Sequence, residues 1–263
     1  MSRPGRRGAS VRVVTSARDA LKLAQEEPDR QVVFAAVGFE TTTPPTADVL
    51  IRAEAEGLGN FSVLAAHKLV IPAMLALLAS GEVQIDGFLC PGHVSVIIGS
   101  DAYRPGVEQY AKPCVVAGFE PLQMMAGLTA IVEQVAKGQA CLGNVYGAAV
   151  RAEGNAAARW LVGEVFDVGD ADWRSIGVIP GSGLVLNAKY RKYDAEERFG
   201  VKFGPDNAIA GCRCGDVIKG LKDPFDCPLF GKACTPQKPI GPCMVSSEGS
   251  CQAYYKYHRF RPE

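Results

Sequence analysis

The chain has 263 residues, of which 48% are hydrophobic, so it is long enough to bury a sizeable core in one large domain or two ordinary ones. Lysine plus arginine and aspartate plus glutamate each number 28, and this balance gives no overall field that would attract nucleic acid or an anionic membrane. The longest apolar runs, such as residues 32–37, are far shorter than a membrane-spanning helix. We therefore expect a folded protein that binds neither nucleic acid nor membrane.

The first residues contain the pair Arg6 and Arg7, a feature of twin-arginine export signals. Such a signal needs a sustained apolar segment next, but residues 11–16 are interrupted by charge and hydroxyl groups. We predict no signal peptide and a cytoplasmic protein. Because thiols stay reduced in the cytoplasm, we expect clustered cysteines to serve metal or redox chemistry rather than structural disulfides.

From about residue 30 the sequence alternates short β-branched apolar runs with longer segments of helical periodicity, which is typical of βαβ units. The apolar runs predict strands buried on both faces of a parallel sheet, at residues 32–37, 61–66, 87–89 and 114–117. The remaining segments predict helices at residues 46–56, 71–79, 94–110, 122–137 and 156–168. The expected fold class is α/β, with one or more parallel-sheet, Rossmann-like domains.

The last third of the sequence changes in character. Residues 176–186 predict two strands broken at a turn. From Tyr190 onward, charged residues, glycine, proline and cysteine become frequent, and we place a domain boundary near residue 205. This gives α/β structure over residues 1–205 and a cysteine-rich domain over residues 206–263.

Polar side chains follow each of the four predicted strands, and the tripeptide Gly-Phe-Glu occurs after two of them. The carboxyl ends of the strands are where open α/β sheets place their ligand sites, so we expect a cleft there. Taken singly, each of these residues could equally cap a helix or lie in an ordinary turn. The four side chains are Glu40, His67, His93 and Glu120.

Six of the nine cysteines lie in the last quarter of the chain, at Cys212, Cys214, Cys227, Cys234, Cys243 and Cys251. From Cys212, fourteen residues intervene before Cys227, six before Cys234 and sixteen before Cys251. Thiolates from separated, glycine- and proline-rich loops suit a [4Fe-4S] cluster, whereas structural zinc sites usually take their ligands as two close pairs. The spacing favours an iron-sulfur cluster, with zinc as the alternative.

The other three cysteines are separate from this group. Cys114 and Cys141 are isolated in apolar surroundings and are predicted to be inert. Cys90 lies at the end of a predicted strand, close to His93, and remains a candidate for chemistry.

Six short motifs, spread over nearly the whole chain, are specific in combination. They are Gly38-Phe39-Glu40-Thr41-Thr42, Ala66-His67-Lys68-Leu69-Val70, Cys90-Pro91-Gly92-His93-Val94-Ser95, Gly118-Phe119-Glu120-Pro121, Gly211-Cys212-Arg213-Cys214-Gly215-Asp216 and Val245-Ser246-Ser247-Glu248-Gly249-Ser250-Cys251. With these motifs the chain resembles the HypD family, whose members help to build the iron centre of nickel-iron hydrogenases.

The resemblance implies a scaffold with α/β domains and a [4Fe-4S] domain that supplies electrons, rather than a conventional enzyme. It implies two partners, a HypC-type chaperone and a HypE-type cyanide donor, and a transiently bound iron that receives cyanide and carbonyl ligands. It makes Cys212, Cys227, Cys234 and Cys251 the cluster ligands, with Cys214 as the substitute if one assignment is wrong.

The resemblance also suggests residues for the iron-assembly site. His93 and Glu248, the latter three residues before a cluster ligand, become candidates to line the assembly cleft together with Glu40. We add Cys90 to this set because of its place at a strand end beside His93.

The chain departs from the family in one respect. HypD proteins carry an upstream segment with a Cys-Gly-Thr-His motif, whose cysteine is thought to hold the iron, and a Cys-Pro-x-Cys pair, and neither motif occurs here. Met1 falls where the family is already in mid-chain. We expect this chain alone to keep the cluster but not to complete iron-ligand assembly.

Two other functions compete with the scaffold. A thiol-disulfide redox protein using Cys212 and Cys214, or Cys90, would need an exposed thiol of low pKa, and a zinc-stabilised binding module would contain no iron.

The closing segment 253–261 mixes aromatic residues with positive charge, and we predict a packed or partner-facing helix there rather than a nucleic-acid site.

Overall fold

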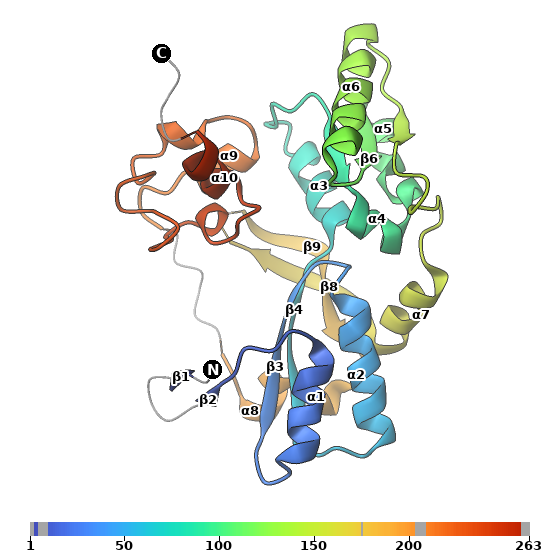
Figure 1. The fold of residues 1–263 in the computed structure, drawn as a ribbon, viewed down its shortest axis with the longest axis vertical. Coiled ribbons are helices and arrows are strands. Elements are labelled where there is room, and N and C mark those ends of the chain that lie inside the picture. The colour runs from blue at the N-terminus through green and yellow to red at the C-terminus, as the bar shows by residue number, and fades with distance from the viewer. Residues whose placement is uncertain (1–2, 5–9, 175, 203–208, 259–263) are drawn as a thin grey trace.

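The computed structural model describes residues 3–4, 10–174, 176–202 and 209–258. The chain forms three regions: two α/β halves, each with its own hydrophobic core, and a cysteine region over residues 209–258 (Figure 1). The mixed α/β class with parallel strands is as predicted. Among the described residues, no helix is long and apolar enough to cross a membrane.

The first half begins with a short antiparallel pair, β1 (Arg3–Pro4) and β2 (Ser10–Val11). Its main elements are α1 (Ala17–Glu26), β3 (Val32–Gly38), α2 (Thr43–Ala55) and β4 (Phe61–His67). Strands β3 and β4 pair in parallel, in a register that sets Val32 opposite Phe61 and Gly38 opposite His67. Their carboxyl ends therefore lie side by side.

The two strands of this sheet differ in burial. Strand β4 is buried or half-buried throughout, as predicted. In β3, alternate residues are exposed, with Val33 at 46% and Val37 at 72%, so the prediction of burial on both faces is wrong for this strand. The alternation arises because one face of β3 is covered and the other faces solvent.

The second half contains a separate three-stranded sheet. Its elements are α3 (Val70–Ala79), β5 (Phe88–Pro91), α4 (Gly92–Ile98), a 3-10 turn (Ser100–Tyr103), α5 (Arg104–Tyr110), β6 (Cys114–Ala117), α6 (Pro121–Lys137) and β7 (Leu142–Asn144). The strands are parallel in the order β5-β6-β7. The four predicted strands thus belong to two sheets rather than one, and β7 was not predicted.

The helix predicted over residues 94–110 is divided. Gly99 ends α4 with φ 89° and ψ 159°, a backbone conformation essentially restricted to glycine. A Cβ at Gly99 would lie 2.1 Å from the carbonyl oxygen of Ala152, so this glycine also permits a close approach of two backbones. The chain therefore turns at Gly99 and restarts as the 3-10 turn and α5.

An antiparallel ribbon follows the second half. It consists of β8 (Phe166–Trp173) and β9 (Gly177–Leu186), and it is preceded by α7 (Ala156–Val165). The helix predicted to reach residue 168 therefore ends at Val165. The two strands predicted over residues 176–186 are the single strand β9. The break expected as a turn is a β-bulge-like shift of register, opposite Gly169 and Ala171 of β8.

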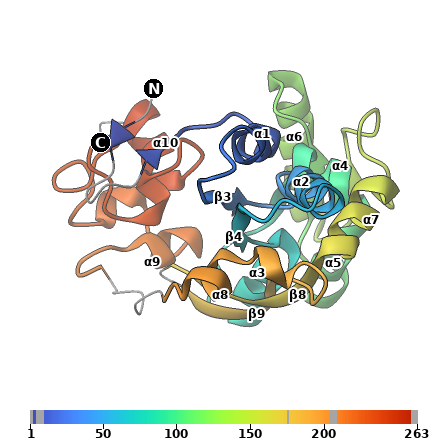
Figure 2. The same cartoon turned by 90° about the horizontal axis from the view of Figure 1, so that it is seen from below.

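The ribbon returns the chain to the first half. The core that contains Leu50 and Phe61 also contains Phe166, Leu186 and Tyr190, whereas the core of the second half is drawn from residues 70–150. A 3-10 turn (Arg191–Tyr193) and α8 (Ala195–Phe199) follow β9, and Figure 2 shows α8 and the ribbon beneath β4. The second half is thus inserted within the first.

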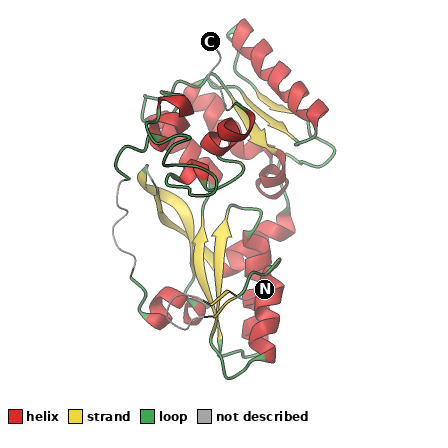
Figure 3. Cartoon of the chain, turned by 60° about the vertical axis from the view of Figure 1, so that its left-hand side comes forward, coloured by secondary structure: helices red, strands yellow, loops and turns green. Residues whose placement is uncertain are grey.

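The cysteine region is built mainly from loops (Figure 3). Its short elements are α9 (Cys214–Ile218), 3-10 turns (Pro224–Asp226 and Pro242–Met244) and α10 (Ser250–Tyr257). It contacts the second half through Lys219, whose carbonyl accepts from the Gln84 N–H at 3.0 Å and whose amine pairs with Glu82 at 2.5 Å. The boundary predicted near residue 205 lies outside the described residues.

Helix α10 is packed, as we predicted for the segment after the last cysteine. Its aromatic residues contact rings elsewhere in the cysteine region: Tyr254 lies 5.9 Å from Phe225, and Tyr255 lies 6.1 Å from Phe230, between ring centroids. Residues 259–261 of the predicted segment lie outside the described residues. Aromatic packing therefore accounts for Tyr254 and Tyr255, whereas Tyr257 is exposed.

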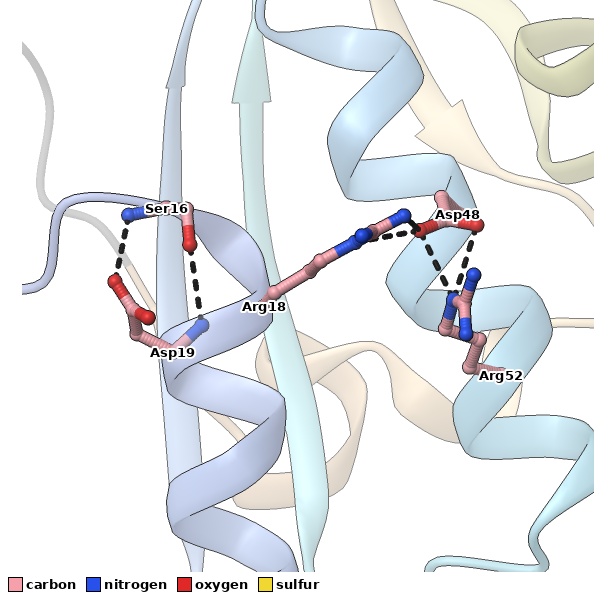
Figure 4. A network of polar contacts seen from close by, with 5 residues as sticks. All are labelled: Ser16, Arg18, Asp19, Asp48 and Arg52. Carbon is pink, nitrogen blue, oxygen red and sulfur yellow. Dashed lines mark hydrogen bonds and ion pairs between the residues drawn. The ribbon is translucent and has the colours of Figure 1, made fainter.

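A polar network joins the two helices of the first half (Figure 4). The side chain of Ser16 caps α1 in a capping box with Asp19. Asp48 of α2 accepts hydrogen bonds from Arg18 of α1 at 3.0 Å and from Arg52, one turn further along α2, at 3.0 Å. Burial raises the pKa of Asp48, but the hydrogen bonds from Arg52 and Arg18 outweigh it and leave the pKa below its ordinary value.

Replacing Asp48 by asparagine is expected to lower the free energy of unfolding by up to about 1 kcal/mol at neutral pH, because the pairs are partly solvated. A depressed folded-state pKa contributes stability above the ordinary value of 3.8, and this contribution is lost as the pH falls through the folded-state value. Urea unfolding from pH 7 to pH 3 should therefore show the difference between D48N and the parent shrinking. A difference that grows on acidification would contradict this.

Candidate functional site

All six late cysteines lie close together in the cysteine region. Cys214, Cys234, Cys243 and Cys251 belong to one buried core, and Cys212 is packed against it. Cys227 is also buried, and its thiol lies 3.8 Å from the carbonyl oxygen of Gly211, immediately before Cys212. The structure therefore brings together the four predicted cluster ligands and both extra cysteines.

Local backbone features hold the thiols in place. Cys227 directly follows the 3-10 turn of Pro224–Asp226, which has its own capping box, and Cys251 lies in the first turn of α10. The Ile240 N–H donates to the Cys234 sulfur at 3.3 Å. A Cβ at Gly241 would lie 2.6 Å from the Cys212 sulfur, so the absence of a side chain there lets the backbone approach this thiol.

These residues fit a [4Fe-4S] group. The donors are thiols from separated loops, one receives a backbone N–H, and apolar side chains including Ile218, Leu229 and Ile240 pack around them. Four thiolates on one zinc ion would lie only about 3.8 Å apart, from Zn–S bonds of about 2.3 Å. Among the described residues, no group of three or more His, Cys, Asp or Glu is arranged to hold a single metal ion. The preference for a cluster over zinc therefore rests on the spacing of the thiols along the chain.

The two extra cysteines lie inside this site. The Cys243 sulfur is 3.2 Å from that of Cys251. Hydrogen bonds from Cys214 and then from Cys251 lower the pKa of Cys243, and the same contacts raise the pKa of Cys214 and of Cys251. From the sequence, Cys243 was not among the four predicted cluster ligands. No residue near it in the sequence indicates its contact with Cys251.

Glu40 lies between the two halves and is 7% exposed. Its Oε1 accepts a hydrogen bond of 2.8 Å from the Val70 N–H at the start of α3, and its Oε2 has no partner among the described residues. Burial raises the pKa of this carboxyl, against the weaker effect of the Val70 hydrogen bond. His67, at the end of the neighbouring strand, is also buried, and burial lowers its pKa to about 4.

The second Gly-Phe-Glu corner is arranged differently from the first. Glu120 is exposed, and so is His93, whose ring lies 5.0 Å from that of Phe119. The two sheets thus place equivalent residues in different surroundings, so the four polar side chains do not share one sheet edge as predicted. The assumption of a single sheet caused this error.

Cys90 and Glu248 lie in two further environments. Cys90 is 2% exposed, inside the core of the second half, and its contact with Cys114 and its burial raise its pKa. Glu248 is exposed in the cysteine region. A buried thiol of raised pKa is poorly suited to disulfide exchange, which argues against a redox role for Cys90.

A cavity of about 460 Å³ lies at the boundary of the halves and includes Glu40. Its walls come from the start of α3, the end of α4, helix α7 and the ribbon, and they are mostly apolar. Arg159, on α7, is the cationic side chain of this lining. Sequence reasoning missed Arg159, because nothing around it distinguishes it from other surface arginines.

Comparison with known proteins gives a consistent result. The family model described as HypD, hydrogenase formation hypA family, matches residues 2–258. The hydrogenase maturation factor HypD of Cupriavidus necator is 46% identical over 261 residues, and that of Azotobacter vinelandii is 47% identical over 260; each match covers 97% of this chain and 69% of the relative. A putative hydrogenase expression/formation protein of Methanocaldococcus jannaschii is 43% identical over 252 residues, covering 96% of this chain and 70% of the relative.

Proposed function

This chain belongs to the HypD family of hydrogenase maturation factors, and from that premise we propose that it is a scaffold for assembling the Fe(CN)2CO centre of nickel-iron hydrogenases. The observation that carries the proposal is the convergence of six cysteines in one small core. A metal-free binding module would have no need for that number of neighbouring thiols.

In this proposal, Cys212, Cys227, Cys234 and Cys251 hold a [4Fe-4S] cluster, with Cys214 as the substitute for one of them. When bound, the cluster supplies electrons one at a time. The chain contributes the surroundings: Gly241 leaves space beside Cys212, the Ile240 N–H donates to the Cys234 sulfur, and apolar side chains exclude water.

The iron that receives cyanide and carbonyl is a substrate of the scaffold. We propose that a HypC-type chaperone and a HypE-type cyanide donor bind this chain during assembly. Exposed His93, beside Phe119, is available to such partners, as is exposed Glu248. Glu40 offers a buried carboxyl in the cavity between the halves, and Cys90 is the least accessible member of the proposed set.

The test is to express the chain without oxygen in a HypD-deficient cell together with both partners. We expect a brown protein that copurifies with the chaperone but lacks the full set of infrared bands of iron-bound cyanide and carbonyl, because this chain alone is not expected to complete iron-ligand assembly. A colourless chain that contains one zinc ion and does not copurify with the chaperone would contradict the proposal. That outcome would favour the zinc-stabilised binding module.

A further inference from the structure

We propose that the open side of β3 binds an extended apolar strand, supplied by the part of a HypD chain that this chain does not match. Strand β3 pairs with β4 on one side, and among the described residues no strand pairs with its other side (Figure 1). The inference goes beyond the proposed function, because it concerns completion of a sheet and involves neither the cluster nor the iron.

The backbone of β3 is free to form hydrogen bonds on its open side. The Val32 N–H donates to the carbonyl oxygen of Asn60 at 2.8 Å, and the Gly38 carbonyl oxygen accepts from the Lys68 N–H at 2.9 Å, both on the side of β4. Alternate residues of a strand bond to the same neighbour, so the N–H and C=O groups in between point to the open side. These groups belong to Val33, Ala35 and Val37.

The side chains of the same three residues are apolar and exposed. Val33 is 46% exposed, Val37 is 72% exposed, and Ala35 between them is also exposed. Natural proteins protect an open strand edge with charges, proline, a bulge or a very short strand, but β3 runs for seven residues without charge or proline. Parallel sheets are normally covered on both faces, so β3 has the character of an inner strand that lacks a neighbour.

A groove of about 400 Å³ lies beside the open strand. Its walls are residues 32–35 of β3, Ala20 and Leu23 of α1, and the segment that contains Val11 and Val14. A strand added beside β3 places alternate side chains against α1 and the others next to the exposed side chains of β3. Because both sets meet apolar surface, the occupant is a near-continuous apolar run.

The charged groups of the groove do not require a charged ligand. Arg12 pairs with Glu27 at 2.6 Å, and Arg30 pairs with the same carboxyl group at 3.1 Å. These are the three charged side chains of the lining, and they interact with one another. The groove therefore favours an uncharged segment.

The comparison with relatives indicates where such a strand comes from. The match covers 97% of this chain but 69% of the Cupriavidus necator relative, so that protein contains polypeptide with no counterpart here. A second copy of this chain is a poorer occupant, because in a symmetric pair it would bring its own residues 10–14 to the same groove. A single strand does not have this difficulty.

The test produces the full chain in one cell with the unmatched part of the Cupriavidus necator relative, as a separate tagged polypeptide. We expect a one-to-one complex by size-exclusion chromatography with light scattering. Amide exchange at Val33, Ala35 and Val37 should be at least about tenfold slower in the complex than in the chain alone. Exchange at Val116, in the separate sheet of the second half, should stay the same.

A pair of matched double variants assigns the binding to β3. V33K/V37K should weaken the complex at least about tenfold, because docking would bury two ammonium groups. V178K/V185K adds the same charge at valines of β9 that are 66% and 46% exposed, and it should bind like the parent. Thermal unfolding checks that both variants are folded, and the exchange measurement on the parent needs no substitution.

Three results would overturn the proposal: no complex, a complex in which exchange at β3 is unchanged, or equal binding by the two double variants. A dimer of the chain alone that is protected at β3 would assign the open side to a second copy, and this result would overturn it too.

Discussion

Replacing Cys234 by alanine should remove most of the iron and sulfide that the chain binds when reconstituted without oxygen. Its residue is buried, and its sulfur accepts a hydrogen bond from the Ile240 N–H at 3.3 Å. Loss of one thiolate leaves an iron without its protein ligand, and we expect cluster retention under chelator competition to fall at least about tenfold. Iron and sulfide analysis with absorption spectroscopy measures the loss.

Cys234 is a sharper choice for this test than Cys251. Cys243 lies 3.2 Å from Cys251 and is placed to replace it as a ligand, so C251A is expected to lose less cluster than C234A. Cys141 is exposed and distant in sequence from the group, and C141A serves as the control that should keep the full content. A C234A protein with the parent's iron and sulfide would refute the ligand assignment.

Replacing Gly99 by alanine is expected to lower the free energy of unfolding by about 3–5 kcal/mol. Two costs combine. The backbone, at φ 89° and ψ 159°, is unfavourable for alanine, and the new Cβ would lie 2.1 Å from the Ala152 carbonyl oxygen and 2.6 Å from the Gly154 nitrogen. Neither contact can be relieved by rotating a side chain.

The matched control is Gly138, which ends α6 with φ 63° and ψ 28°. A Cβ there meets nothing within 4 Å, so G138A carries only the backbone cost of about 1–2 kcal/mol. Comparing the free energy of unfolding of both variants in urea separates the cost of the backbone conformation from the cost of the steric clash. Equal losses in the two proteins would show that the close approach at Gly99 contributes nothing.

The secondary structure was predicted best where the sequence carries a strong local signal. Residues 114–117 form β6 as expected, and the helix predicted over 122–137 begins one residue earlier, at Pro121. What could not be predicted is which strands pair. The local sequence shows that each strand is apolar, but strand pairing depends on contacts between distant residues. Strands β4 and β5 are consecutive in the sequence, yet they belong to different sheets because the second half is inserted within the first.

The candidate site, like the fold, could be predicted from the sequence only in part. Crowding of cysteines in the sequence correctly indicated that they would lie together, whereas the contact between Cys243 and Cys251 depends on how the loops cross. The two Gly-Phe-Glu corners are identical in sequence, yet Glu40 is buried and Glu120 is exposed. The difference comes from neighbours such as Val70, which the local sequence does not contain.

The insertion of one half into the other also sets an order for folding during synthesis. Residues 70–150 contain all members of their own buried core, so this part can fold as soon as it leaves the ribosome. Leu50 and Phe61 are made earlier, but their core includes Phe166, Leu186 and Tyr190 and stays incomplete until the ribbon emerges. Leu50 and Phe61 are therefore made before the second half but reach their final packing after it, and these apolar residues need protection in the meantime.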